Sequence, residues 1–288
     1  MTASEQLIKH LASQDAIWVT VQAHRGSVPR EAGAWMAVFA DTTMGSIGGG
    51  HLELQAMAQA RTQLGGPAGA QLRRFALGPS LGQCCGGEVT LQFEPVSSTD
   101  RPRLRQHFAA QQALWPPVAL FGGGHVAAAL EQVLGYLPFL VHWVDSRDGI
   151  FPDTLPGNVH AEHSEPVQRA VAGLAPGSRV LIMSFSHAED LDVVAACLLR
   201  QRLRGDLPLI GLIGSRSKWA VFSHRLTERG FSAAELTQVT CPIGVPGIAG
   251  KEPEVIAIAV AAQLLQALPM TNSEKNLNEA NELAKATR

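Results

Sequence analysis

The chain has 288 residues, of which 46% are hydrophobic and 17% charged, and its formal net charge is −2. This length suits two domains that each bury an ordinary hydrophobic core. The near-neutral charge argues against a nucleic-acid-binding protein, so we expect no nucleic-acid partner. Basic residues gather at 101–105 and 200–204, but their helical spacing predicts solvated faces.

Signals for targeting or membrane anchoring are weak. Residues 1–10 include Glu5 and Lys9 and contain no apolar signal core. The longest apolar stretch, residues 255–270, is interrupted by two glutamines and is short for a bilayer, so we expect a packed helix and no membrane association. Four cysteines without a secretion signal predict a reducing, cytoplasmic location.

The amino-terminal part combines short strands with one or two helices, which predicts a small α+β domain over residues 1–97. We expect helices at 4–13 and 51–64, and strands at 16–21, 34–40, 44–47, 71–77 and 88–93. A helix-start signature at 97–100 and the prolines after Trp115 predict a connecting helix and linker over residues 98–116.

Strands and helices alternate in the remainder of the chain. We expect strands at 118–121, 139–144, 179–183 and 207–213, with helices between them. This alternation predicts a Rossmann-like parallel-sheet domain over residues 117–268, so the fold class is α/β with a small α+β domain in front. Residues 269–288 turn polar after Pro269, which predicts a disordered tail.

Two adjacent cysteines lie in a glycine-rich segment before the strand at residue 88. Adjacent Cα atoms are about 3.8 Å apart, too close for an unstrained disulfide. The glycines permit close backbone approach to a ligand. We therefore expect a site that handles sulfur or a thiolate-binding metal, rather than two small buried residues in a tight turn. Its residues are Gln83, Cys84, Cys85, Gly86 and Gly87.

Two further amino-terminal motifs are rich in groups that bind anions. Ser27 and Arg30 lie in a polar loop, and Gly48, Gly49 and Gly50 precede a predicted helix as a phosphate-type nest. His51 and Glu53 follow in the first turn of that helix. Glu53 is either a polar ligand to a heterocycle or a first-turn acid that satisfies the helix dipole, and the second role is the commoner one.

The third glycine motif has the spacing of a dinucleotide fingerprint. Gly122, Gly123 and Gly124 join a strand to a helix that begins at His125, with Ala127 in the third glycine position. Asp145 ends the next strand, where a ribose-binding acid belongs. These residues predict a Rossmann-like fold, whereas no hydride-transfer group follows them.

Two more strand ends carry polar residues. Gly214 and Ser215 precede a helix with Arg216 and Lys218 in its first turn. Either a bound anion relieves the conflict of these cations with the helix dipole, or Ser215 is an ordinary cap beside surface charges. After the strand at 179–183 comes His187, followed by Glu189, Asp190 and Asp192. We expect Asp190 to cap the helix, in preference to a metal site.

Five motifs in this order together resemble the XdhC family, the accessory proteins of xanthine dehydrogenase maturation. They are residues 26–30, 48–53, 82–87, 122–127 and 211–218, and the resemblance extends over residues 1–268. Where the family commonly has Thr-His-Asp, this chain has Ser186-His187-Ala188, although Asp192 still matches the acid that follows.

The resemblance implies a chaperone without turnover of its own, rather than a metabolic enzyme. Family members bind the molybdenum cofactor, a pterin dithiolene (molybdopterin) with a phosphate, and support exchange of an oxo ligand for a sulfido ligand. They deliver the product to apo-xanthine dehydrogenase, with sulfur from a cysteine desulfurase. Cys84 and Cys85 are then the expected molybdenum contacts, and we expect a homodimer.

Two other functions stay open. Gly122, Gly124 and Asp145 fit an NAD(P)-dependent oxidoreductase, for which tight binding of NAD or NADP would be the sign. Cys84 and Cys85 also fit a redox or metal sensor, for which modification by mild peroxide would be the sign.

Overall fold

The computed structural model describes residues 2–66, 69–77 and 87–268. The chain divides into two compact units between Ala113 and Leu114. The predicted tail, 269–288, and most of the double-cysteine segment, 78–86, lie outside the described residues.

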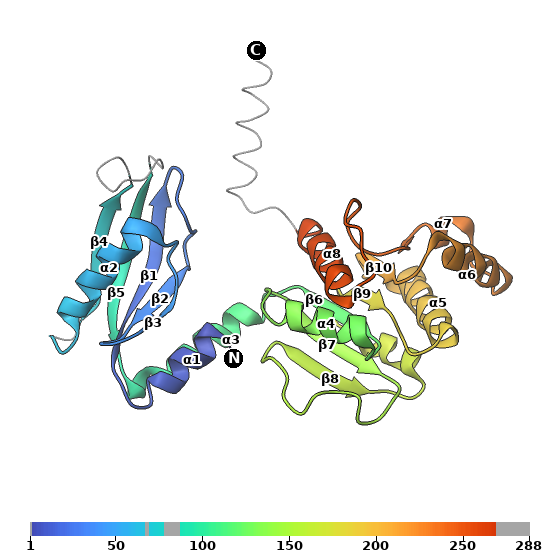
Figure 1. The fold of residues 1–288 in the computed structure, drawn as a ribbon, viewed down its shortest axis with the longest axis horizontal. Helices are drawn as coiled ribbons and strands as arrows, with labels where there is room; N and C mark the ends of the chain where they lie inside the picture. Colours follow the sequence, from blue (N-terminus) through green and yellow to red (C-terminus); the bar gives the residue numbers. More distant parts are fainter. Residues whose placement is uncertain (1, 67–68, 78–86, 269–288) are drawn as a thin grey trace, which may run out of the picture. The chain divides into compact units, whose positions relative to one another are not determined.

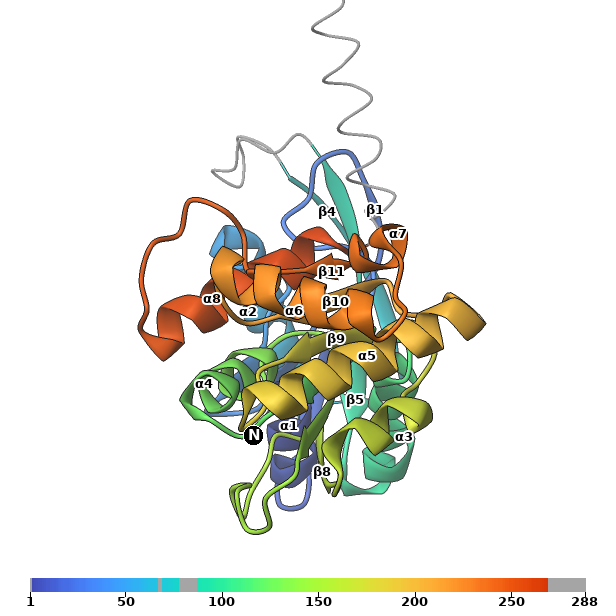
Figure 2. The ribbon, with the colours of Figure 1, turned by 90° about the vertical axis from the view of Figure 1, so that its right-hand side faces the viewer.

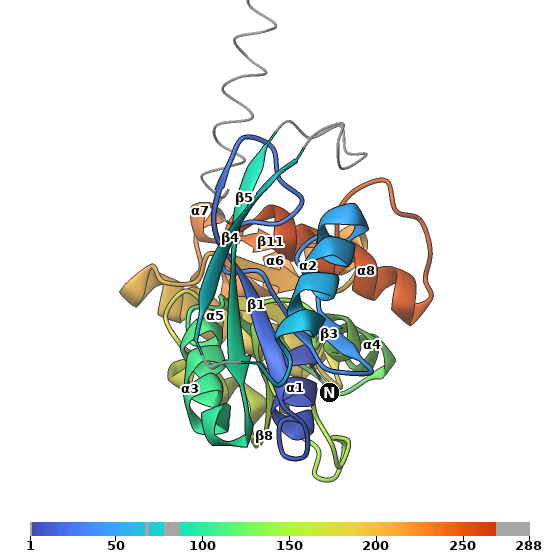
Figure 3. The same cartoon turned by 90° about the vertical axis from the view of Figure 1, so that its left-hand side faces the viewer.

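The first unit is an antiparallel sheet covered on both faces (Figures 1 and 3). The strand order is β3-β2-β1-β5-β4. Its elements are α1 (Ala3–His10), β1 (Ala16–Arg25), β2 (Trp35–Val38), β3 (Thr43–Gly45), α2 (Gly50–Gln63), β4 (Gln71–Ala76), β5 (Glu88–Val96), the 3-10 turn η2 (Ser98–Asp100) and α3 (Arg101–Gln112).

Alternation along β1 explains why helices lie on both sides of this sheet. Ile17 and Val19 pack in the cluster that includes Leu52 of α2, whereas Trp18 packs with Leu7 of α1 and Leu104 of α3 on the other side. Successive side chains of a strand point to opposite faces, so a strand buried on both faces is apolar throughout. The connecting helix α3 thus packs on the first unit.

The second unit is a six-stranded parallel sheet with helices on both faces (Figure 2). Its strand order is β11-β10-β9-β6-β7-β8. Its elements are β6 (Pro117–Phe121), α4 (His125–Leu134), β7 (Leu140–Asp145), β8 (Val159–His163), the 3-10 segment η3 (Val167–Gly173), β9 (Arg179–Ile182), α5 (His187–Arg204), β10 (Leu209–Leu212), α6 (Arg216–Glu228), α7 (Ala233–Leu236), β11 (Val239–Thr240) and α8 (Pro253–Gln266).

This order is that of the Rossmann fold, in which the first and fourth strands are neighbours at the centre of the sheet. Here β6 and β9 are those neighbours, and Phe121 pairs with Ile182 at their carboxyl ends. Leu120 packs with α4 and α8, and Phe121 packs with α5 on the opposite face. The predicted fold class is therefore confirmed.

The sequence expectation was wrong between β7 and β9. A helix was expected there, and the structure has the edge strand β8 and the 3-10 segment η3 instead. Pro152, Pro156 and Pro166 interrupt this stretch. Proline removes a helical hydrogen bond and clashes with the preceding turn, so a continuous helix does not form here.

A buried carboxyl on α4 gives a pH-dependent prediction. Glu131 is 5% exposed, no described side chain donates to it, and burial raises its pKa. The cost of ionising it is absent below the unfolded pKa and complete above the folded one, so stability falls as the pH rises from the unfolded pKa to the folded pKa.

Glu131→Met should raise the free energy of unfolding by about 1–2 kcal/mol at pH 8, because an unpaired buried charge is replaced by an apolar side chain of similar length. Urea unfolding at pH 8 and pH 5 tests this, with a smaller gain expected at pH 5. An equal gain at both pH values would show that ionisation of Glu131 is not the cause.

Candidate functional site

In the first unit, the fold brings three of the sequence motifs together. A Cβ placed on Gly87 would lie 2.7 Å from the carbonyl oxygen of Arg25 and closer still to that of Ser27. A Cβ on Gly48 would meet Pro29 and would lie 3.3 Å from Cγ of Arg30. The polar loop therefore contacts both the glycine turn and the base of the double-cysteine segment.

Cys84, Cys85, Gln83 and Gly86 themselves lie outside the described residues. The described ends of that segment are joined by a hydrogen bond, which Leu77 N donates to Gly87 O at 2.7 Å. Gly87 is buried. The described end of the segment, Gly87, thus lies beside Ser27.

The carboxylate of Glu53 is the anion that the backbone N–H groups of the glycine turn bind. Its Oε2 accepts hydrogen bonds from Ser46 Oγ at 2.6 Å and from the backbone N–H groups of Ile47 and Gly49 at 3.0 Å. Although burial opposes the shift, these hydrogen bonds hold the pKa of Glu53 below its usual value. Gly49 therefore donates to the protein's own carboxylate. Glu53 orders the turn, while Gly50 and His51 begin α2.

In the second unit, Gly122 leaves β6 at the centre of the sheet. Its φ is +117°, and a Cβ there would lie 2.6 Å from the carbonyl carbon of Met183 and 3.0 Å from Cα of Ser184. No side chain fits between these strand ends. This is the switch point at which open α/β sheets bind ligands.

Asp145 lies at the end of β7, as expected, but its carboxylate is already engaged. Oδ1 accepts hydrogen bonds from the backbone N and Nε of Arg147 at 2.8 and 2.9 Å, and Oδ2 accepts from Nη2 at 2.9 Å. Burial opposes ionisation, but these bonds, the charge of Arg147 and the Gly123 N–H lower the pKa of Asp145. Asp145 is 1% exposed. It therefore fixes Arg147 and the glycine turn, and it offers no free oxygen to a ribose.

Gly124 is the open position of the turn. It is the N-cap of α4, no side chain caps this helix, and its first turn holds no acidic residue. A Cβ on Gly124 would meet no atom within 4 Å. The α4 N-terminus thus presents uncapped N–H groups and the positive end of a helix dipole to open space, with His125 exposed beside it.

The segment after β9 is tied to the segment after β7. Ser146 Oγ donates to Glu189 Oε1 at 2.6 Å, and the guanidinium of Arg147 lies 4.7 Å from the ring centroid of Phe185. Since β6 lies between β7 and β9, both contacts cross the end of β6 above the glycine turn. They therefore join the loops that flank the glycine turn, at the sheet edge where a Rossmann fold binds its ligand.

The expected capping role of Asp190 is corrected. Ser186 is the N-cap of α5 and accepts from Glu189 N at 3.2 Å. Asp190 accepts instead from Ser184 N and from Lys218 Nζ, both at 2.7 Å. Because Asp190 lies within the first turn, its side chain reaches back to the strand end and across to α6.

The chain itself supplies the anion that Lys218 needs. Ser215 caps α6, and Lys218 Nζ contacts Asp190 and also donates to Ile213 O at 2.8 Å. Gly214, at φ +155°, leaves room for the Lys218 side chain, whose Cδ would lie 2.6 Å from a Cβ there. Arg216 is exposed. His187 faces Phe222 of α6, with ring centroids 6.2 Å apart.

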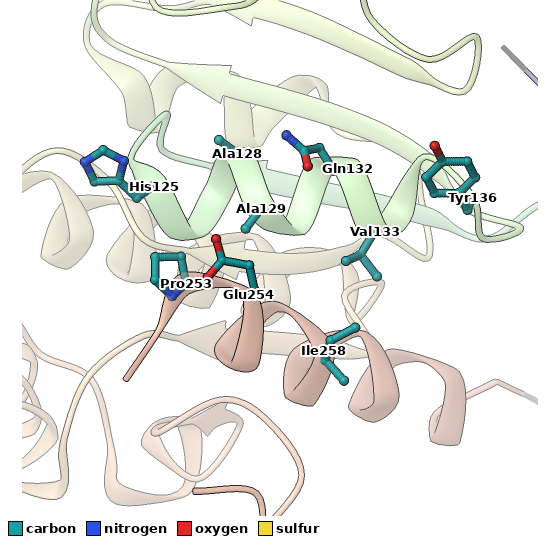
Figure 4. Close-up of a pocket in the computed structure, with 9 residues that line it drawn as sticks. All are labelled: His125, Ala128, Ala129, Gln132, Val133, Tyr136, Pro253, Glu254 and Ile258. Atoms are coloured by element: carbon teal, nitrogen blue, oxygen red, sulfur yellow. The ribbon is translucent and has the colours of Figure 1, made fainter. Parts of the chain in front are cut away.

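A pocket of about 530 Å³ opens on the outer face of α4 and α8, beginning at His125 (Figure 4). Small and aliphatic side chains form most of its walls, Glu254 lies beside Pro253 toward the His125 end, and Tyr136 lies at the opposite end. The lining residues are His125, Ala128, Ala129, Gln132, Val133, Tyr136, Pro253, Glu254 and Ile258. His125 therefore borders both the glycine turn and this pocket.

Within the described part of the chain, no group of three or more His, Cys, Asp or Glu side chains could hold a metal ion. Likewise, none of the helices that the structure describes is long and apolar enough to cross a membrane.

Sequence reasoning missed Phe185 and the structural roles of Arg147 and Asp190. Their contacts join residues that follow different strands, so spacing along the chain does not reveal them. The one available signal was position, because all three follow the carboxyl end of a predicted strand.

Comparison with protein families gives two matches. A family model described as the XdhC Rossmann domain matches residues 118–264, and one described as the XdhC and CoxI family matches residues 10–76. Among curated proteins, the uncharacterised protein YqeB of Escherichia coli strain K12 is 28% identical over 253 residues. That alignment covers 84% of this chain and 41% of YqeB, so the chain spans about two fifths of its relative.

Among solved structures, a Bacillus halodurans protein described as a xanthine dehydrogenase superposes with a TM-score of 0.72. The match covers 93% of this chain and 96% of that chain at 20% identity, which shows a shared fold. The oxidoreductase ylbE from Lactococcus lactis gives a TM-score of 0.27 at 15% identity, over 52% of this chain and 62% of that one, which is too low to support an argument.

Proposed function

Since matches to its family models extend over residues 10–76 and 118–264, the chain belongs to the XdhC family, and we propose that it is a molybdenum cofactor chaperone for xanthine dehydrogenase. Family membership points to a xanthine dehydrogenase accessory role. We propose specifically that the protein binds the cofactor, supports its sulfuration and delivers it to the apo-enzyme, without turnover of its own. A cysteine desulfurase supplies the sulfur, and the chain acts as a cytoplasmic homodimer.

The observation that carries this proposal is the open, uncapped N-terminus of α4 at Gly124. Helix N-termini of this kind bind phosphate groups, and molybdopterin carries one. The hydroxyl of Ser184, on the neighbouring strand end, has no hydrogen-bond partner among the described residues, so it could donate to one further group. The residues present therefore fit a phosphate-bearing ligand.

Each unit has a separate task in this proposal. Gly124 and His125 hold the phosphate, while Asp145 and Arg147 fix the turn around it. Cys84 and Cys85 provide soft thiolate ligands or a persulfide sulfur, which suits a cofactor that supplies a sulfur-ligated molybdenum centre. Ser27 lies beside Gly87 and Arg30 lies beside Gly48 in the same polar loop, and the donors of both side chains suit an anion.

The alternative, an NAD(P)-dependent oxidoreductase, is less well supported. Both carboxylate oxygens of Asp145, the expected ribose ligand, already accept hydrogen bonds from Arg147. Calorimetry with NAD and NADP should therefore give no binding heat. Tight binding of either would favour the oxidoreductase.

The protein purified from a cofactor-producing host should contain molybdenum and show pterin fluorescence. Cys85→Ala should retain far less molybdenum per protomer, because a charged soft ligand is lost, whereas Cys241→Ala should retain the wild-type amount. Cys241 is a suitable control because it is partly buried in the second unit, with Sγ 3.9 Å from Ser215 O. Wild-type protein that neither contains nor takes up the cofactor would overturn the proposal.

A further inference from the structure

Phe185 is an exposed aromatic residue that neighbouring side chains hold in position. It is 66% exposed, although it lies only three residues beyond the end of the central strand β9. The backbone N–H of Phe185 donates to Glu189 Oε2 at 3.2 Å, and Glu189 is in turn bonded to Ser146. Most exposed apolar side chains need no explanation, but this one is held in place from two directions.

The second support is the guanidinium of Arg147. It lies 4.7 Å from the Phe185 ring centroid, within the range of a cation–π contact. Asp145 holds this guanidinium through both carboxylate oxygens, and its side chain is fully buried. Arg147 therefore covers one side of the ring, and the 66% exposure leaves surface available for a second planar group.

The pairing of β6 with β9 relates the Phe185 ring to the proposed phosphate site. Because Phe121 pairs with Ile182, the residues that leave β6 and β9 advance side by side, Gly122 beside Met183. Gly124 and Phe185 are each the third residue beyond those paired positions. Ser184, immediately before Phe185, has the buried hydroxyl without a partner in the part of the chain that the structure describes.

We propose that Phe185, supported by Arg147, is the stacking surface for the planar heteroaromatic ring of the ligand whose phosphate binds at the α4 N-terminus. This inference rests on the proposed function, because it concerns the same ligand, and it specifies how the pterin ring is recognised. Stacking on an aromatic side chain tolerates different rings, so the surface selects planar heterocycles as a class.

The test is titration with a fluorescent 6-substituted pterin monophosphate, followed by fluorescence quenching. Phe185→Ala should weaken binding about 10- to 100-fold, in line with the loss of one ring-stacking contact. Phe185→Trp should retain wild-type affinity. Inorganic phosphate should compete equally with the probe in wild type and Phe185→Trp, and all variants should keep the wild-type thermal midpoint because the changed side chain is exposed.

Tyr136→Ala is the matched control, since Tyr136 is an exposed aromatic at 88% that lines the α4–α8 pocket instead. Its affinity for the probe should be unchanged. A loss in Tyr136→Ala with none in Phe185→Ala would place the ring in the pocket and overturn the proposal, as would a wild-type protein that does not bind the probe.

The same experiment separates this inference from the proposed function. Wild-type protein that carries molybdenum while Phe185→Ala binds the probe normally would overturn the stacking surface and leave the chaperone function standing. Protein that carries no molybdenum but binds the probe in a Phe185-dependent manner would support the stacking surface and overturn the chaperone function.

Discussion

Lys218→Met should lower the free energy of unfolding by about 3–5 kcal/mol, because it leaves a buried carboxylate without its cation. The side chain of Asp190 is 3% exposed and that of Lys218 is 13% exposed, with 2.7 Å between their charged atoms. Lys218 also binds the Ile213 carbonyl, so the substitution leaves a second group unpaired. Urea denaturation of wild type and variant gives the difference directly.

Two further variants isolate the cause. Arg216→Met removes an exposed charge from the same helix turn and should change stability by about 0.5 kcal/mol or less. Combining Lys218→Met with Asp190→Asn should restore part of the loss, because the remaining amide carries no charge. If the single Lys218 variant were as stable as the Arg216 variant, the buried pair would not hold the two strand ends together.

The features predicted well from the sequence are those with local signals. The strand from 118 to 121, the glycine turn and the helix that begins at His125 form a contiguous pattern, and the structure places them as expected. The parallel sheet followed from the alternation of strands with helices, since parallel strands need crossover connections. The cap at Ser215 followed from residue type and position alone.

The features missed depend on contacts between distant residues. Arg200 was expected on a solvated face, but its side chain is 4% exposed and binds Asp206 and the carbonyls of Val171 and Leu174. Helical spacing cannot distinguish such an arginine from its exposed neighbour Arg204. Similarly, Asp190 and Lys218 are 28 positions apart, and their pairing becomes visible only when β9 and β10 are adjacent.

Among alanine substitutions at the described glycines of the second unit, Gly122→Ala should lower the free energy of unfolding the most. The new Cβ would lie 2.6 Å from the Met183 carbonyl carbon and 3.0 Å from Cα of Ser184, and both are backbone atoms of the adjacent strand. The φ of +117° adds conformational strain for any residue with a Cβ. Overpacking and strain each cost about 1–3 kcal/mol, so the free energy of unfolding should fall by about 2–6 kcal/mol.

Gly124→Ala, two positions further along the same turn, should change stability little and weaken ligand binding. Its φ is −76° and no atom lies within 4 Å of the added Cβ, so the stability should fall by about 1 kcal/mol or less, the cost of a poorer N-cap. Yet the methyl group would stand where a phosphate approaches the α4 N–H groups, so affinity for the pterin monophosphate should drop. Urea unfolding and probe titration of both variants test the pair. If Gly124→Ala bound the probe normally, the open space at Gly124 would have no part in ligand binding, and the phosphate would have to be placed elsewhere.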